Sequence, residues 1–180
     1  MTGRSHPEDE DANVQAHRES ALTRVPCAVL TVSDTRDLET DASGALVVEL
    51  LTGAGHPVVL RELVRDEPAE IVAAVRRALG HPEVRAVVLT GGTGVAPRDV
   101  TPETVGPLLD RVIPGFGELF RALSYQEIGS AALLSRALAG LAGGRVVFAL
   151  PGSRGAVRLA LEKLVLPELG HLVGEARKTR

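Results

Sequence analysis

The sequence predicts an α/β fold in which a mainly parallel sheet carries helices on both faces. Two observations predict it. Short apolar runs alternate with segments of helical periodicity, and each apolar run ends in a polar or glycine-rich turn. Strands that alternate with helices need right-handed crossover connections, which make a sheet mainly parallel. The 180 residues suit one domain with a substantial core, for which we assign residues 25–180.

The elements of the first half follow from their apolar patterns. The continuous apolar run Cys27–Val32 is typical of a buried strand, and the Val-rich run that ends at Thr90 has the same character. Between them, two segments with one apolar helical face are closed by glycine or proline. The pattern predicts strands at 27–32, 57–64 and 86–90, and helices at 46–54 and 68–79.

The second half opens with a helix start signal. Thr101 is a predicted N-cap, Pro102 suits the first helical position, and Glu103 favours the positive end of the helix dipole. The pattern then predicts a short helix to about residue 109, helices at 118–127 and 131–138, a strand at 145–150, and a helix at 155–166 that continues after Pro167.

Composition excludes several classes of function. A net charge of −3 argues against a broad electrostatic surface for nucleic acid or anionic membrane. The single cysteine, Cys27, lies in an apolar run, so neither an intrachain disulfide nor a thiolate metal cluster is expected. Residues 1–24 carry five acids against three arginines and predict a flexible tail without a secretory signal. No uncharged apolar run has the length of a membrane span, so we expect a cytoplasmic protein.

Three polar turns follow predicted strands: Ser33–Arg36, Thr90–Gly94 and Pro151–Ser153. Because the carboxyl ends of parallel strands meet at one edge of a sheet, we expect the three turns to lie together. Their small residues leave backbone N–H groups open to a phosphate or another oxyanion. The glycine turn alone is equally consistent with a plain tight turn, but the three turns together favour a phosphorylated ligand.

Asp34, Asp66 and Asp99 follow strands at the same predicted edge. Carboxylates that share a site with phosphates indicate Mg²⁺, and no nucleophile–base pair is suggested, so phosphoryl or nucleotidyl transfer fits. Local roles stay open for two of them: Asp66 as the N-cap of the helix that begins near Pro68, and Asp34 in an Asx-turn.

A series of motifs extends in order from about residue 26 to 174: VSDTR (Val32–Arg36), DASG (Asp41–Gly44), RDE (Arg65–Glu67), LTGGTG (Leu89–Gly94), RDVTPE (Arg98–Glu103), PGFGELFR (Pro114–Arg121), LSRALAG (Leu134–Gly140) and LPGS (Leu150–Ser153). This ordered set resembles the MoaB/MogA family of molybdenum-cofactor biosynthesis and is similar to the G domain of gephyrin. SYQEIG (Ser124–Gly129) and PELGHL (Pro167–Leu172) are more similar to the MoaB branch.

The resemblance implies a three-layer α/β/α molybdopterin-binding fold that assembles as a homo-oligomer, a trimer or a hexamer. It implies an enzyme, a molybdopterin adenylyltransferase, with ATP and molybdopterin as substrates and Mg²⁺ as cofactor. The terminal phosphate of molybdopterin would attack the α-phosphorus of ATP and release pyrophosphate. A phosphate nucleophile is already ionised at neutral pH and needs no general base.

Residue by residue, the resemblance implies that Asp66 and Asp99 are the catalytic, metal-linked acids. It places the nucleotide and its phosphates at Ser33, Asp34, Gly91, Gly92, Thr93 and Gly94, and the pterin at Gly115, Gly117, Ser135, Pro151, Gly152 and Ser153. Arg98 and Arg136 are candidate phosphate partners, with an exposed loop residue and an exposed helix residue as the alternatives.

Two other functions remain open. A MoaB-type protein that binds molybdopterin without turnover would be a carrier or scaffold. A nucleotide pyrophosphatase similar to the CinA-type proteins shares the domain, but its loop usually has the form GGLGPTxDD, whereas this chain has GGTGVAPRD.

Overall fold

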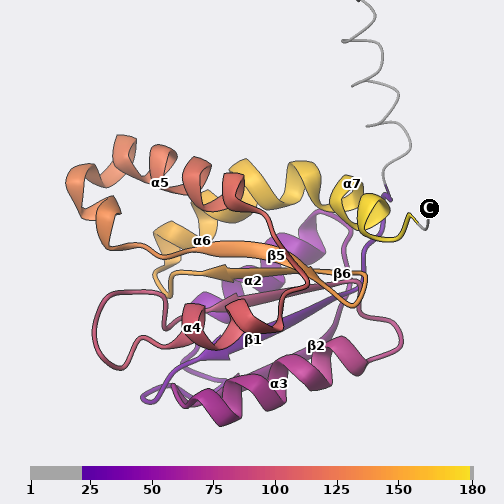
Figure 1. The fold of residues 1–180 in the computed structure, drawn as a ribbon, viewed down its shortest axis with the longest axis horizontal. Helices are drawn as coiled ribbons and strands as arrows, with labels where there is room; N and C mark the ends of the chain where they lie inside the picture. Colours follow the sequence, from indigo (N-terminus) through magenta and orange to yellow (C-terminus); the bar gives the residue numbers. More distant parts are fainter. Residues whose placement is uncertain (1–21, 179–180) are drawn as a thin grey trace, which may run out of the picture.

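A six-stranded sheet forms the centre of the protein (Figure 1), and its strand order is β2-β1-β3-β6-β5-β4. The computed structural model describes residues 22–178, so most of the predicted tail 1–24 lies outside the described residues. The strands are β1 (Cys27–Val32), β2 (Val58–Val64), β3 (Ala86–Thr90), β4 (Arg111–Val112), β5 (Leu138–Ala142) and β6 (Arg145–Leu150). The helices are α2 (Ala42–Gly53), α3 (Pro68–Gly80), α4 (Thr101–Val105), α5 (Pro114–Ile128), α6 (Arg154–Ala160) and α7 (Leu166–Ala176), with 3₁₀ turns at Gly106–Leu108 and Gly129–Leu134 and a π-helical turn at Leu161–Val165.

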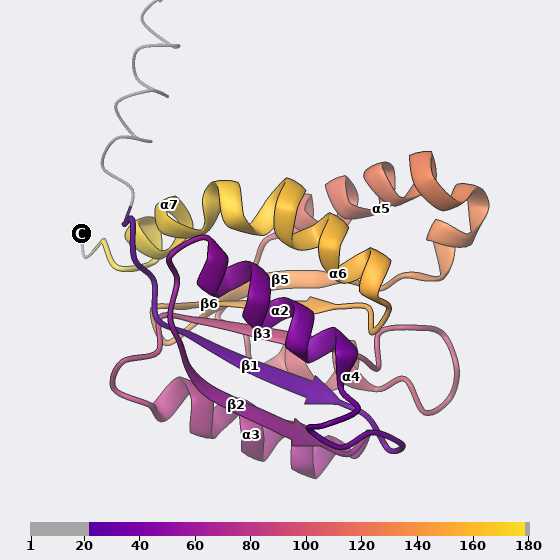
Figure 2. The same ribbon diagram turned by 180° about the vertical axis from the view of Figure 1, so that it is seen from behind.

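The sheet is mainly parallel, as predicted. Strands β2, β1, β3 and β6 are mutually parallel, whereas β5 pairs antiparallel with β6 and with β4. Helices α3 and α4 cover one face, and α2, α5, α6 and α7 cover the other (Figure 2). The three-layer α/β/α arrangement is therefore confirmed.

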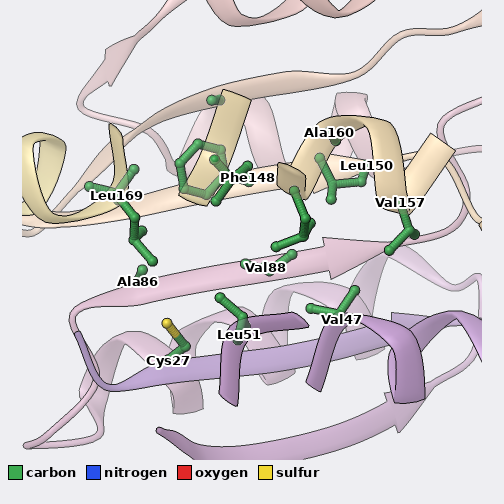
Figure 3. Packing of buried hydrophobic residues seen from close by; sticks show 14 of the residues in the cluster. Cys27, Val47, Leu51, Ala86, Val88, Phe148, Leu150, Val157, Ala160 and Leu169 are labelled. Atoms are coloured by element: carbon green, nitrogen blue, oxygen red, sulfur yellow. The ribbon is translucent and has the colours of Figure 1, made fainter. Parts of the chain in front are cut away.

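The core consists of two layers, one on each face of the sheet. Successive residues of β3 alternate between them, so that Val88 packs toward α2 and α6 while Val87 and Leu89 pack toward α3. In the first layer Phe148 lies edge-on to Phe116 at 5.4 Å between ring centroids, and Figure 3 shows the same layer from Leu169 to Val157. Parallel strands buried on both faces explain why these runs are continuously apolar in the sequence.

Cys27 lies in this core, as predicted. Its side chain is fully buried beside Leu51 (Figure 3), and its thiol donates to the carbonyl of Val25 at 3.3 Å. Burial raises the pKa of the thiol to about 12, because the thiolate would lose its hydration. The backbone N–H of Val25 donates to Nδ1 of the buried His56 at 3.1 Å.

The predicted helix at 131–138 is wrong. Only 129–134 forms a short 3₁₀ helix, and the chain then enters β5. Leu and Ala favour helices in isolation, but two glycines with positive φ, Gly143 and Gly144 (54° and 73°), form a hairpin turn that returns β5 onto β6. At Gly140 a Cβ would lie 2.5 Å from the carbonyl of Arg111, so this strand position admits only glycine.

Two predicted helix caps are also wrong. The N-cap of α3 is Glu67, not Asp66, and the N-cap of α4 is Val100, with Thr101 already in the helix. The long C-terminal helix is as predicted except for the π-helical turn before Pro167, where the missing N–H of proline interrupts the regular ladder. Across residues 22–178, no helix has the length and apolar character needed to cross a membrane.

Candidate functional site

A cavity of about 640 Å³ lies at the carboxyl ends of β1, β2, β3 and β6. The three predicted turns and the three aspartates all line it. Of the residues that the sequence assigned to the site, including its two candidate phosphate partners, Gly115, Gly117 and Arg136 do not line the cavity. The parallel topology thus brings together segments that are far apart in the chain.

The glycine turn after β3 is tightly enclosed. Gly91 and Gly92 have φ values of 108° and 64°, which other residues rarely adopt. A Cβ on Gly91 would overlap the carbonyl oxygen of Val32, and the Gly91 N–H donates to the carbonyl of Leu150 at 3.0 Å. Within the described chain, the N–H groups of residues 92–94 donate to no protein acceptor, so they are free to bind an anion.

Asp66 is the most unusual acid in the cavity. Its Oδ1 is buried and has no hydrogen-bond partner among the described residues, and it would lie 2.7 Å from a Cβ on Gly92. Burial, followed by the charges of Asp34 and Asp99, raises the pKa of the Asp66 carboxyl. The charge of Arg98 and a backbone hydrogen bond from Val100 act on its pKa in the opposite direction, and Oδ1 is the oxygen left without a partner among the described residues.

Asp34 links two strand ends. Its Oδ1 accepts from the backbone N–H of Asp66 at 3.0 Å, and its Oδ2 forms an ion pair with Arg98. These contacts, the backbone bond first, lower the pKa of Asp34. The alternative of a local Asx-turn is therefore wrong. Arg98 is 61% exposed, as the loop alternative predicted, but it is paired with the acid.

Asp99 packs against the glycine turn. Its Oδ2 accepts from the backbone N–H of Ala96 at 2.9 Å and would lie 2.6 Å from a Cβ on Gly94. Because Gly92 has no side chain, it leaves room for the carboxylate of Asp66. Gly94 leaves room for Asp99 in the same way.

The donor set suits Mg²⁺ that arrives with phosphates. Within residues 22–178, no group of three His, Cys, Asp or Glu side chains is close enough to hold a metal ion by itself. Mg²⁺ usually takes one or two carboxylates and completes its shell with water and substrate phosphates. The unpartnered oxygen of Asp66 and the neighbouring Asp99 fit that requirement.

One wall of the cavity is apolar and was missed from the sequence. It is formed by Phe120 and Ile128 of α5, with Ala131 and Leu134 of the 3₁₀ turn that follows. Ser124 lies between them on the same helix face. The spacing 120, 124, 128 is the signal that could have found this wall.

Two further polar contacts missed from the sequence hold the cavity edge. Ser43 donates to the carbonyl of Gly152 at 2.6 Å, and Thr90 donates to the carbonyl of Pro151 at 3.1 Å. Both side chains line the cavity and join the third turn to α2 and β3.

Among the remaining predictions, the structure gives a packing reason for Gly117 but none for Gly115. A Cβ on Gly117 would lie 2.7 Å from the carbonyl of Ala137, so this glycine allows α5 to approach the chain next to β5. Nothing lies within 4 Å of a Cβ on Gly115. Arg136 follows the 3₁₀ turn and is half-buried, so the alternative of an exposed helix residue is wrong.

Comparison with known proteins gives consistent results. Residues 28–171 match the family described as "Probable molybdopterin binding domain". The chain is 49% identical over 169 residues to molybdenum cofactor biosynthesis protein B of Halalkalibacterium halodurans, which covers 93% of this chain and 99% of that protein. A crystal structure of a molybdenum cofactor biosynthesis protein B has a TM-score of 0.85 at 53% identity, covering 87% and 98% of the two chains. The tungsten cofactor synthesizing protein MoaB from Pyrococcus furiosus has a TM-score of 0.79 at 38% identity, covering 88% and 100%.

Proposed function

This chain belongs to the MoaB group of the molybdopterin-binding family, the family that its motifs resemble, and we propose that it adenylylates molybdopterin with ATP and Mg²⁺. Membership makes it a molybdenum- or tungsten-cofactor biosynthesis protein. The observation that carries the finer proposal is the buried, unpartnered Oδ1 of Asp66, next to Asp99 and to a glycine turn with free N–H groups.

The polar wall supplies the phosphate chemistry. The N–H groups of residues 92–94 bind triphosphate oxygens, and Asp66 and Asp99 are the residues that would hold Mg²⁺. When bound, Mg²⁺ neutralises charge on the phosphates. Ser33 and Asp34, also assigned to the nucleotide and its phosphates, complete this binding surface, and Pro151–Ser153, assigned to the pterin, line the same cavity.

The reaction requires alignment rather than a protein nucleophile. An oxygen of the terminal phosphate of molybdopterin forms a bond to the α-phosphorus, while the bond from that phosphorus to the bridging oxygen breaks and pyrophosphate leaves. The chain holds the two substrates in line and excludes water, and positioning of this kind supplies most of the catalysis in such transfers. The apolar wall at Phe120 and Ile128 gives a surface for a flat heterocycle, and a volume of about 640 Å³ is typical of a small-molecule site.

A single-turnover assay tests the proposal. Purified protein is mixed with molybdopterin, Mg²⁺ and ATP labelled at the α-phosphate, with Asp99→Asn in parallel and circular dichroism to check its fold. Wild-type protein is expected to give adenylylated molybdopterin, and Asp99→Asn to give little. Asp99→Asn at the wild-type rate would refute the assigned role of this acid. Tight pterin binding without product indicates a carrier, and AMP formed without molybdopterin indicates a pyrophosphatase.

We also propose a homo-oligomer, a trimer or a hexamer. Several large apolar side chains are exposed on α5 and the turn after it, among them Leu119, Tyr125 and Leu133. Exposed apolar patches of this kind mark interaction surfaces. Light scattering of the purified protein is expected to give three or six subunits, and a monomer would contradict this part of the proposal.

A further inference from the structure

Arg136 connects the two walls of the cavity. It directly follows Leu134 and Ser135, which line the apolar wall, and it forms four hydrogen bonds to the segment 93–103 on the polar wall. Its backbone N–H donates to the carbonyl of Thr93 at 3.0 Å.

The guanidinium group spans three acceptors at once. Its Nε donates to the carbonyl of Gly94 at 2.7 Å, its Nη2 donates to the carbonyl of Asp99 at 2.6 Å, and its Nη1 pairs with the carboxylate of Glu103. A planar guanidinium presents donors in a fixed fork, so it can hold separate acceptors in one geometry. Lysine has its donors on a single nitrogen and cannot reproduce that arrangement.

Two observations argue against a phosphate ligand at this position. Arg136 does not line the large cavity, although its neighbour Ser135 does; it lines a separate cavity of about 340 Å³ beside Asp99 and Glu103. Its positive charge is paired with Glu103, which lowers its attraction for an incoming anion. We therefore propose that Arg136 is a positioning residue, which holds the loop from Gly94 to Asp99 and so fixes the Asp99 carboxylate relative to the glycine turn. The catalytic part of this inference rests on the proposed function.

The test compares Arg136→Lys with a matched control, Arg158→Lys. Arg158 is an exposed arginine on α6 that pairs with Glu162 and does not line the cavity. Hydrogen–deuterium exchange is measured on the ligand-free protein. Because hydrogen bonds from charged donors are among the stronger ones, the amides of Asp99 and Thr101 are expected to exchange about tenfold faster in Arg136→Lys. The control should exchange as wild type, and unchanged exchange in Arg136→Lys would overturn the proposal.

Two further readouts separate positioning from phosphate binding. For a positioning role we expect a roughly tenfold lower kcat with the KM for ATP within about threefold, and unchanged binding of inorganic pyrophosphate in equilibrium dialysis. A raised KM at constant kcat, together with loss of pyrophosphate binding, would make Arg136 a phosphate ligand instead.

The experiments distinguish a failure of the adenylyltransferase proposal from a failure of the positioning role proposed for Arg136. If wild-type protein shows no turnover, the adenylyltransferase proposal fails, while the exchange and pyrophosphate readouts still decide the role of Arg136. If Arg136→Lys does not fold, Glu103→Gln replaces it, because loss of the paired carboxylate should loosen the same amides.

Discussion

Asp66 should destabilise the ligand-free protein, so that Asp66→Asn is more stable than wild type at pH 7. The carboxylate has one buried oxygen without a partner, and the charges of Asp34 and Asp99 act on it. Leaving a buried polar group unpaired costs roughly 1–3 kcal/mol. Asp66 is only partly buried, and asparagine removes the charge but keeps a polar group. We therefore expect Asp66→Asn to raise the free energy of unfolding by about 1 kcal/mol, at the lower end of that range. For a chain of this size, 1 kcal/mol corresponds to a rise in Tm of about 2–4 °C.

The pH dependence gives the sharper test. The pKa of Asp66 is higher in the folded protein than its ordinary value of 3.8, so the folded protein binds this proton more tightly than the unfolded chain does. The destabilisation is therefore fully present above the folded pKa and disappears as the pH falls below 3.8. The advantage of Asp66→Asn should disappear over the same range.

Urea unfolding in the presence of EDTA, from pH 7 down to pH 3.5, measures this difference. Asp37→Asn is the matched control, since hydrogen bonds from Thr40 lower the pKa of Asp37. That variant should gain no stability at pH 7. An Asp66→Asn variant that is less stable than wild type at pH 7, or whose advantage is independent of pH, would refute the electrostatic explanation. Adding Mg²⁺ and ATP should then stabilise wild type but not Asp66→Asn, because only wild type retains the acid.

Three further predictions concern other positions. Burial raises the pKa of Cys27 to about 12, so its thiol should not react with a disulfide reagent at pH 8 in the native protein. It should react fully in guanidinium, and rapid labelling of the native protein would contradict its burial. Burial lowers the pKa of His56 below 6.5. The free energy of unfolding should therefore keep its full value above pH 6.5 and decrease as the pH falls from 6.5 toward the folded pKa. Chemical denaturation of His56→Gln should show no such decrease. Gly92→Ala should abolish nucleotide binding in calorimetry, because its φ is 64° and its methyl group would overlap the Thr101 hydroxyl. Gly53→Ala, in an open helical position, should bind normally and be about 0.5–1 kcal/mol more stable; equal effects of the two alanines would contradict the packing argument.

Much of the site could be predicted from the sequence because it depends on parallel topology. The apolar runs of β1, β3 and β6 identify strands buried on both faces, and parallel strands present their carboxyl ends at one edge. That rule alone brings the turn at Ser33, the glycine turn at Gly91 and the turn at Gly152 to one cavity. The roles of Asp66 and Asp99 in binding and catalysis stay predictions.

The tertiary structure alone decided the parts that depend on contacts between distant segments. The sequence predicts a helix at 131–138, but the chain leaves a 3₁₀ turn at Leu134 and Leu138 begins β5, because β4 and β6 pair with that strand on either side. Asp66 has a reasonable sequence position for a cap, yet its carboxylate is held in the cavity beside the residues of two other strand ends. Arg136 finds its acceptors on α4 and on the loop before it, more than thirty residues earlier in the chain. Local patterns determine elements and their order, whereas hydrogen-bond partners and burial arise only when the elements pack together.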